Sequence, residues 1–156
     1  MSNPVLEFLK TREGKLLDGS PSPVTTWLNG RLLSVSPGRA TVEYEVRKEM
    51  TNPLGTLQGG IFTTMMDDAL GVAVYSLGKN KSYTSVNFYV DYLESAVKGD
   101  RIRVSADIIR EGNTILNISM TVKNAEGKML AKGESNLVAK DIEGFSLPKF
   151  RGMEQG

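Results

Sequence analysis

The chain has 156 residues, carries 19 lysines and arginines against 18 aspartates and glutamates, and contains neither histidine nor cysteine. Its length suits one domain, which buries roughly 70% of its unfolded surface, and its balanced charge argues against a general nucleic-acid or membrane-surface binder. Without histidine and cysteine, a Ser-His-Asp triad, a Cys-His pair, a disulfide and a histidine- or thiolate-ligated metal are excluded, so any catalysis depends on carboxylates, amides, hydroxyls and backbone dipoles.

The N-terminal part is predicted to form a short helix and a loop. Asn3 suits the N-cap of this helix and Pro4 its first position. Its apolar side consists of Val5, Leu6, Phe8 and Leu9. Residues 11–25 contain two glycines and two prolines and are predicted to be a loop.

A hairpin is predicted to follow this loop. Residues 27–35 form its first strand and Pro37-Gly38 its turn. The second strand has the clearest pattern, because polar residues alternate with apolar ones. The apolar positions of this strand are Ala40, Val42, Tyr44 and Val46.

The stretch that begins at Gly59-Gly60 and runs to Leu77 is apolar on nearly every side. This pattern indicates a buried helix, and the stretch is too short and too polar to span a membrane. Two carboxylates, Asp67 and Asp68, lie in its middle. Because an aspartate is rarely buried without a partner or a task, these carboxylates are the strongest functional signal in the chain.

Four further strands are predicted after Gly78, in antiparallel succession. Alternating apolar residues place them over residues 83–92, 102–108, 116–122 and 129–139. The last residues, 141–156, are predicted to be a loose tail. Three residues of this tail are available for packing, namely Phe145, Leu147 and Phe150.

These elements predict an α+β hotdog fold, an antiparallel sheet of about six strands wrapped around one long buried helix. One sheet cannot enclose a helix completely, so a second copy of the chain is expected to complete its burial. The predicted organisation is an N-terminal helix and loop over residues 1–25, a hotdog domain over 26–140 and a C-terminal tail over 141–156.

Four elements give the chain a specific resemblance. Asn52 is followed six residues later by Gln58-Gly59-Gly60, then by Asp67 and by Ser85 on the next strand. Over residues 30–140 this spacing resembles the phenylacetate-degradation (PaaI-like) type of hotdog thioesterase. The resemblance implies hydrolysis of acyl-CoA thioesters without a metal or organic cofactor, in a homodimer or a homotetramer built from two dimers.

One position departs from the family pattern: Gln58 stands where the family usually has histidine. The glutamine amide donates a hydrogen bond, so it is suited to positioning or polarising a thioester carbonyl. It cannot carry a proton. We therefore expect Gln58 to place the carbonyl and to take no part in proton transfer.

The residues of the motif suit the chemistry of thioester hydrolysis. Gly59 and Gly60 lie at a helix N-terminus, where free N–H groups and the positive end of the dipole favour an oxyanion. Asp67 supplies a base or a nucleophile, and the sequence leaves these two roles open. Asn52 is a candidate for holding the carbonyl or the water, and equally for a turn residue before proline. Ser85 is a candidate for orienting the carboxylate or the water, or is an ordinary strand residue.

The spacing of Gly59 and Asp67 predicts a shared site. Eight residues of helix separate them by about 12 Å along the axis and turn them by about 80°. One carbonyl cannot touch both groups of the same helix. A two-fold axis that brings the N-terminus of one helix to the middle of another resolves this, so the site is expected to lie between subunits.

Other residues have a plain structural interpretation beside a functional one. Asp68 is turned about 100° from Asp67 and is interpreted as structural. Met66 suits the core or the lining of an acyl tunnel. Lys81 and Arg110 are candidates for contacts with CoA phosphates, or solvated surface charges. Gly60 is a candidate for contact with the substrate, or for close helix–strand packing.

Two other functional classes compete with the thioesterase interpretation: a hotdog protein that binds acyl-CoA without turnover, which Gln58 favours, and a purely structural oligomer. No nucleic-acid or membrane partner is expected. The lack of cysteine and of a signal-peptide pattern in the first residues predicts a cytoplasmic location.

Overall fold

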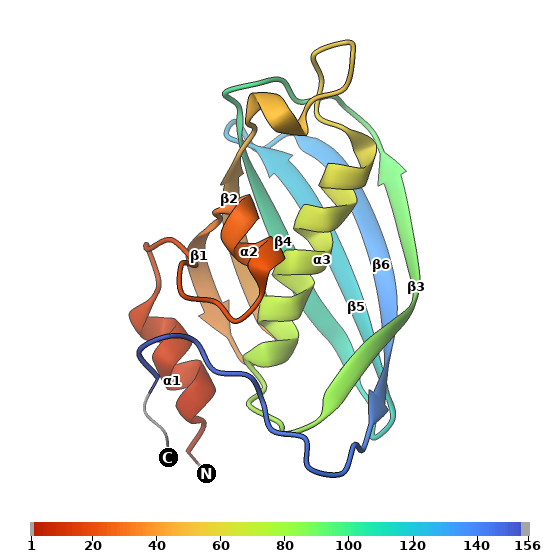
Figure 1. Cartoon of the computed structure of the whole chain (residues 1–156). Helices are drawn as coiled ribbons and strands as arrows, with labels where there is room; N and C mark the ends of the chain where they lie inside the picture. Colours follow the sequence, from red (N-terminus) through yellow and green to blue (C-terminus); the bar gives the residue numbers. More distant parts are fainter. Residues whose placement is uncertain (1, 154–156) are drawn as a thin grey trace.

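Six strands form one antiparallel sheet in the order β1-β2-β4-β5-β6-β3 (Figure 1). Their bounds are β1 (Arg31–Ser36), β2 (Arg39–Glu45), β3 (Ser82–Tyr92), β4 (Arg101–Glu111), β5 (Ile115–Asn124) and β6 (Met129–Lys140). The computed structural model describes residues 2–153. The predicted sheet, its turn at Pro37-Gly38 and the alternating burial of the second strand are confirmed.

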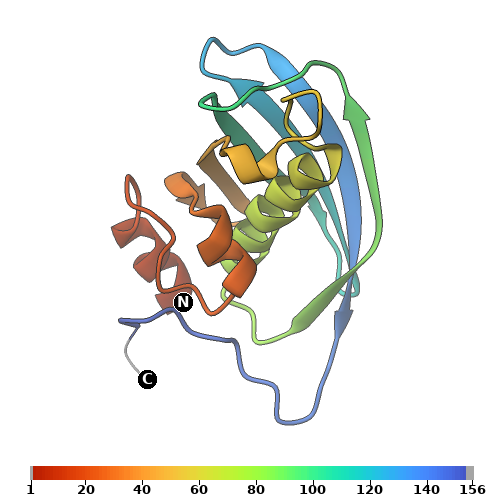
Figure 2. The same cartoon turned by 45° about the horizontal axis from the view of Figure 1, so that its top comes forward.

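The sheet curves around α3 (Gly59–Tyr75), which lies across its concave face (Figures 1 and 2). This arrangement confirms the hotdog fold. Within residues 2–153, no helix is long and apolar enough to cross a membrane. The strand after α3 does not join the predicted succession, because the helix carries the chain across the sheet. As a result, β3 pairs with β6 at the edge instead of with β4.

One side of α3 faces the sheet and the other side is open. The side chains that pack against β2, β4 and β5 are fully buried, and they include Met65, Met66, Ala69 and Ala73. Asp67 and Gly71 lie on the open side and are exposed. A single chain therefore buries only part of the apolar surface of the helix.

The N-terminal helix is confirmed as α1 (Pro4–Thr11), with the Asn3 side chain accepting a hydrogen bond from the Leu6 N–H at 3.0 Å. The Asn3 amide also donates to the carbonyl of Ser76 at 2.9 Å. Asn3 thus caps α1 and fastens it to the end of α3.

Residues 23–28 form a helix, α2 (Pro23–Leu28), so the prediction of a strand over 27–35 is wrong in its first part. The Ser22 hydroxyl caps this helix by accepting from the Thr25 N–H, and Pro23 occupies the first turn. Asn29 ends it in the left-handed conformation, with φ of 54°. The predicted domain boundary between residues 25 and 26 falls inside α2.

The C-terminal tail is packed rather than loose. It leaves β6, crosses the lower end of the molecule and finishes beside α1 (Figures 1 and 2). Phe150 is 7% exposed and packs between Phe8 and Tyr75, with ring centroids 5.7 Å from each. Residues 154–156 of the predicted tail, and Met1 of the predicted N-terminal segment, lie outside the described residues.

Candidate active site

The two adjacent carboxylates of α3 have different surroundings. Asp68 accepts a hydrogen bond from the Thr25 hydroxyl at 2.5 Å and another from the Tyr44 hydroxyl at 2.6 Å, so it ties α3 to α2 and β2. Asp67 points to the open side of the helix, and among residues 2–153 no group donates a hydrogen bond to it. Of the two, Asp67 is the carboxylate that is free to act on a ligand.

Although the Asp67 residue is exposed on the open side of α3, its carboxyl is partly shielded from water by the neighbouring side chains, and this desolvation raises its pKa. The negative charge of Asp68 raises the pKa of Asp67 further. Burial also raises the pKa of Asp68, although its hydrogen bonds from Thr25 and Tyr44 oppose that change. A carboxylate with a raised pKa and no hydrogen-bond donor is a stronger base than an ordinary aspartate, which suits it to accept a proton from water.

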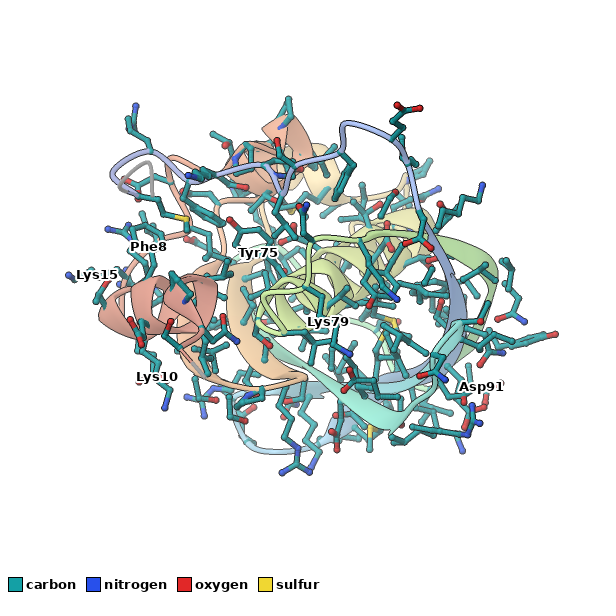
Figure 3. All side chains as sticks on the ribbon, turned by 90° about the horizontal axis from the view of Figure 1, so that it is seen from below. Phe8, Lys10, Lys15, Tyr75, Lys79 and Asp91 are labelled. Atoms are coloured by element: carbon teal, nitrogen blue, oxygen red, sulfur yellow. The ribbon has the colours of Figure 1, made fainter. Side chains whose placement is uncertain are left out.

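A cleft of about 920 Å³ lies beside Asp67, between α3 and the edge strand β3. Ser85 and Lys81 line the cleft with Asp67, so the structure brings these three predicted site residues together. Figure 3, viewed from below, shows α3 end-on within the curve of the sheet, with Lys79 at this end of the molecule. Lys79 also lines the cleft and forms an ion pair with Glu111, whereas Lys81 forms none with a described residue.

The N-terminus of α3 presents the predicted Gln58-Gly59-Gly60 segment. Gln58 is the exposed N-cap, and its side chain makes no capping hydrogen bond. The Ile61 N–H donates to the Gln58 carbonyl at 2.9 Å, which leaves the N–H groups of Gly59 and Gly60 without a partner within the helix. A Cβ built on Gly60 would meet no atom within 4 Å. This helix end is therefore open to an approaching ligand.

Tyr92 supports this helix end and was not identified from the sequence. Its hydroxyl donates to the Gly59 carbonyl at 3.0 Å and lies 2.8 Å from the Thr63 hydroxyl. Its ring lies against Gly59, where a Cβ would be 3.4 Å from the nearest ring atom. No spacing rule in the sequence links a tyrosine at the end of β3 with the start of α3.

Asn52 lies in the loop that precedes α3. Its side-chain oxygen accepts from the N–H groups of Leu54 and Thr56, and its amide donates to the Thr56 hydroxyl at 2.8 Å. These bonds hold the loop, as the turn interpretation of Asn52 predicts. Its contact with a substrate carbonyl or water stays a prediction.

Two predicted substrate-binding residues lie away from the cleft. Met66 is fully buried on the sheet side of α3. Arg110 is exposed near the end of β4 and does not line the cleft, although its neighbour Glu111 pairs with Lys79 at the rim. The structure therefore does not bring Met66 or Arg110 to Asp67.

Within one chain, the predicted oxyanion donors at Gly59 lie far from the predicted catalytic carboxylate of Asp67. Gly59 and Asp67 belong to the same unbroken helix, in which eight residues span about 12 Å. The cleft beside Asp67 is bordered by β3, whose outer edge pairs with no other described strand. Along this strand, Val86 and Tyr89 are exposed.

Comparison with known proteins relates the chain to thioesterases. The model of the thioesterase superfamily matches residues 54–131. Acyl-coenzyme A thioesterase 13 of Homo sapiens is 32% identical over 103 residues, which cover 65% of this chain and 74% of that protein.

Two solved structures have a similar fold. The Escherichia coli PaaI protein of the phenylacetic acid degradation operon has a TM-score of 0.70 at 21% identity, covering 74% of this chain and 86% of that one. A hypothetical thioesterase of Streptococcus pneumoniae, solved with coenzyme A, has a TM-score of 0.68 at 20% identity, covering 72% of this chain and 86% of that one.

Proposed function

The chain belongs to the thioesterase superfamily and has the hotdog fold of PaaI-like thioesterases, and on this premise we propose that it hydrolyses acyl-CoA thioesters at a site shared by two subunits. The match to an acyl-coenzyme A thioesterase supports this substrate class. The coenzyme A in the related Streptococcus pneumoniae structure supports it as well.

The observation that carries the proposal is the Asp67 carboxylate. It lies on a cleft, accepts no hydrogen bond from a described residue and has a raised pKa. In the proposed dimer, the N-terminus of α3 in the partner subunit faces Asp67 across this cleft. The thioester carbonyl then lies between the carboxylate of one chain and the first-turn N–H groups of the other.

The proposed reaction is a hydrolysis in which Asp67 acts as base or nucleophile. As a base, Asp67 takes a proton from water while the water oxygen bonds to the carbonyl carbon. The carbonyl electrons move onto oxygen, where N–H groups at the partner's Gly59 stabilise the charge. When the C–S bond breaks, the CoA sulfur leaves with the bond electrons and takes up the proton, giving the free acid and the thiol. As a nucleophile, Asp67 bonds to the acyl carbon to form an anhydride, and the C–S bond breaks with CoA leaving as the thiolate. Water then hydrolyses the anhydride to the free acid, which regenerates the Asp67 carboxylate and releases the proton that the thiolate takes up.

The remaining motif residues position the reactants in this proposal. Gln58 donates its amide hydrogen bond to the carbonyl, and its exposed side chain at the N-cap supports that role. Ser85 faces the same cleft as Asp67 and orients the carboxylate or the water. Lys81 at the cleft rim attracts the CoA phosphates. Asn52 keeps the loop before Gln58 in shape.

The proposed dimer places its two-fold axis beside β3 and perpendicular to it, so that the two copies of α3 run in opposite directions. An unpaired edge of this length, with exposed Val86 and Tyr89, requires cover in a stable assembly. The proposed contact between the two subunits at β3 also covers the open side of α3. We propose a homo-oligomer of at least two chains.

A thiol-release assay tests the proposal. Acetyl-, hexanoyl-, octanoyl-, dodecanoyl- and phenylacetyl-CoA are the substrates, and the parent chain is compared with Asp67→Asn. We expect release of CoA by the parent on at least one substrate and its loss in the variant. Release at the same rate in both proteins contradicts the proposed role of Asp67.

A further inference from the structure

The first turn of α3 begins with two adjacent glycines, Gly59 and Gly60, whose N–H groups are the proposed oxyanion donors. Glycine has more backbone freedom than any other residue, and the ends of helices fray. Donors stabilise a developing oxyanion best when their direction is fixed before the reaction begins. The Gln58 side chain makes no capping hydrogen bond, so the order of this turn depends on contacts from elsewhere in the chain.

Tyr92, the last residue of β3, makes such a contact. Figures 1 and 2 show the end of β3 beside the first turn of α3. The Tyr92 hydroxyl donates to the Gly59 carbonyl at 3.0 Å, and a Cβ built on Gly59 would lie 3.4 Å from the nearest atom of the Tyr92 ring. The ring also packs edge-on against Phe62, with ring centroids 5.9 Å apart. Tyr92 therefore contacts Gly59 with both its hydroxyl and its ring.

Thr63 gives the hydrogen bonds of this cluster a direction. Its hydroxyl lies 2.8 Å from the Tyr92 hydroxyl and 3.3 Å from the Gly59 carbonyl. Each hydroxyl has one proton to donate, so two protons serve three contacts. The two shorter contacts are both satisfied when Thr63 donates to Tyr92 and Tyr92 donates to Gly59. In such a chain each hydrogen bond strengthens the next one.

The Gly59 carbonyl belongs to the same planar peptide group as the Gly60 N–H. A hydrogen bond to this carbonyl oxygen holds the plane of the group and draws electrons away from its nitrogen, which makes the Gly60 N–H a stronger donor. The contact with the Tyr92 ring also restricts Gly59 itself, and with it the direction of the Gly59 N–H. Both proposed oxyanion donors thus depend on Tyr92.

We infer that Tyr92 is a positioning residue of the reaction, which together with Thr63 fixes and polarises the peptide group between Gly59 and Gly60. Tyr92 acts on the oxyanion through these N–H groups and does not itself touch the substrate. The inference rests on the proposed thioesterase function. In the proposed dimer, the cluster and the Asp67 carboxylate that it serves belong to different subunits.

The first test removes the Tyr92 hydroxyl and keeps the ring, in Tyr92→Phe. We expect kcat on the preferred acyl-CoA to fall roughly 3–10-fold, the scale of one hydrogen bond. The KM should be unchanged, because the oxyanion charge develops only in the transition state. A KM that rises while kcat stays parental, or parental values of both in folded protein, overturns the inference.

Tyr89→Phe is the matched control for this variant. Tyr89 also belongs to β3 and is exposed, and its hydroxyl donates to no side chain or backbone group among residues 2–153. We expect Tyr89→Phe to keep the parental kcat. Thermal unfolding shows whether both variants are folded. An equal fall in kcat in the two folded variants assigns the effect to β3 in general and contradicts a specific role of Tyr92.

Thr63 provides a second pair of variants, which tests the direction of the hydrogen bonds. Thr63→Val keeps the shape of the side chain and removes its hydroxyl, whereas Thr63→Ser keeps the hydroxyl. We expect Thr63→Val to lower kcat less than Tyr92→Phe does, because the bond from Tyr92 to Gly59 remains. Thr63→Ser should be close to the parent. A fall in Thr63→Val that equals or exceeds the fall in Tyr92→Phe contradicts the proposed chain.

An infrared measurement separates this inference from the proposed function. Octanoyl-CoA with an isotope-labelled thioester carbonyl is bound to Asp67→Asn protein with and without Tyr92→Phe. Hydrogen bonds to the carbonyl oxygen lower its stretching frequency, and we expect a smaller lowering when the Tyr92 hydroxyl is absent. If the parent hydrolyses no substrate but the two frequencies differ, the role of Tyr92 at the carbonyl stands and the proposed function fails. If the parent hydrolyses acyl-CoA and the two frequencies are equal, the inference fails and the function stands.

Discussion

Asp67 and Asp68 are neighbours on α3, yet Asp68 is held by the hydroxyls of Thr25 and Tyr44 while Asp67 accepts no hydrogen bond from any residue in 2–153. The helix turns by about 100° per residue, so adjacent positions face different surroundings. One carboxylate stabilises the packing of three elements. The other is left at the cleft with a raised pKa.

The first prediction assigns the chemistry to Asp67. Asp67→Asn keeps the shape of the side chain but removes the base and the nucleophile, so thiol release should fall by at least ~10²–10⁴-fold. The fold should be retained, because a neutral amide is easier to bury than a charge. Asp68→Asn is the matched control and should change the rate little. Loss of activity in Asp68→Asn together with full activity in Asp67→Asn would reverse the assignment.

The second prediction concerns pH. The base must be ionised to act, so kcat/KM should rise as pH increases through the raised pKa of Asp67 and then stay level through neutrality. Asp68→Asn removes the negative neighbour that helps to raise this pKa, so the acidic limb should move to lower pH. A pH–rate profile of both proteins measures the shift. A limb that moves upward, or a second limb near neutrality, is inconsistent with Asp67 as the titrating group.

The third prediction concerns Gln58. Loss of one oxyanion-type donor typically costs about 10²-fold in kcat, so Gln58→Ala should be slower by that order. Gln58→Glu should be slower still, because it places an acceptor and a negative charge where a donor is needed. Steady-state rates on the preferred acyl-CoA measure both changes. Parental rates in both variants would show that Gln58 has no part in the reaction.

The fourth prediction tests the shared site by complementation. Gly59→Pro removes the N–H at the first helical position, where proline is well tolerated, and Gln58 has the extended backbone that proline requires before it. We expect Gly59→Pro and Asp67→Asn homodimers each to be inactive. After the two proteins are unfolded and refolded together, each mixed dimer has one intact site and activity should reappear.

Sedimentation of the parent chain accompanies this experiment. A dimer or larger assembly at micromolar concentration is expected, since the open side of α3 and the β3 edge need cover. A folded monomer with full activity contradicts the shared site. Failure of the mixed sample to regain activity, when mass analysis shows that mixed dimers are present, contradicts it as well.

The fifth prediction concerns stability. Tyr44 is fully buried, and Asp68→Ala would remove the 2.6 Å acceptor of its hydroxyl, which would keep only the Met65 carbonyl at 3.3 Å. The free energy of unfolding should therefore fall by about 1.5–3 kcal/mol, the usual contribution of a hydrogen bond to a charged group. Adding Tyr44→Phe to Asp68→Ala should cost less than the sum of the single changes. Urea unfolding of the four proteins measures this coupling, and strictly additive effects would rule it out.

Local sequence patterns predicted most of the fold. The alternation in residues 40–46 and the all-round apolar helix after Gly59 each identify an element, because side-chain period follows directly from backbone geometry. The helix over Pro23–Leu28 was missed because Trp27 and Leu28 were assigned to the strand that follows. The sequence does contain signals for this helix, because Ser22 suits an N-cap and Pro23 suits the first helical turn.

The site was predictable only in part. Asp67 and Ser85, which belong to the family motif, line the same cleft, and so does Lys81, which was a candidate for contact with CoA phosphates or a solvated surface charge. Tyr92 was not found, because its importance depends on its contacts with Gly59 and Thr63, which are distant in the sequence. The packing of Phe150 on Tyr75 and Phe8 could likewise not be foreseen, since no local rule pairs residues from opposite ends of a chain.

The contact between Phe8 and Phe150 also has a consequence for synthesis of the protein. A ribosome synthesises a chain from its N-terminus at roughly 5–20 residues per second, so α1 emerges well before its aromatic partner in the tail. The strands and α3 all leave the ribosome before the tail does. The apolar side of α1 therefore lacks its contact with Phe150 until the tail of the nascent chain has been made.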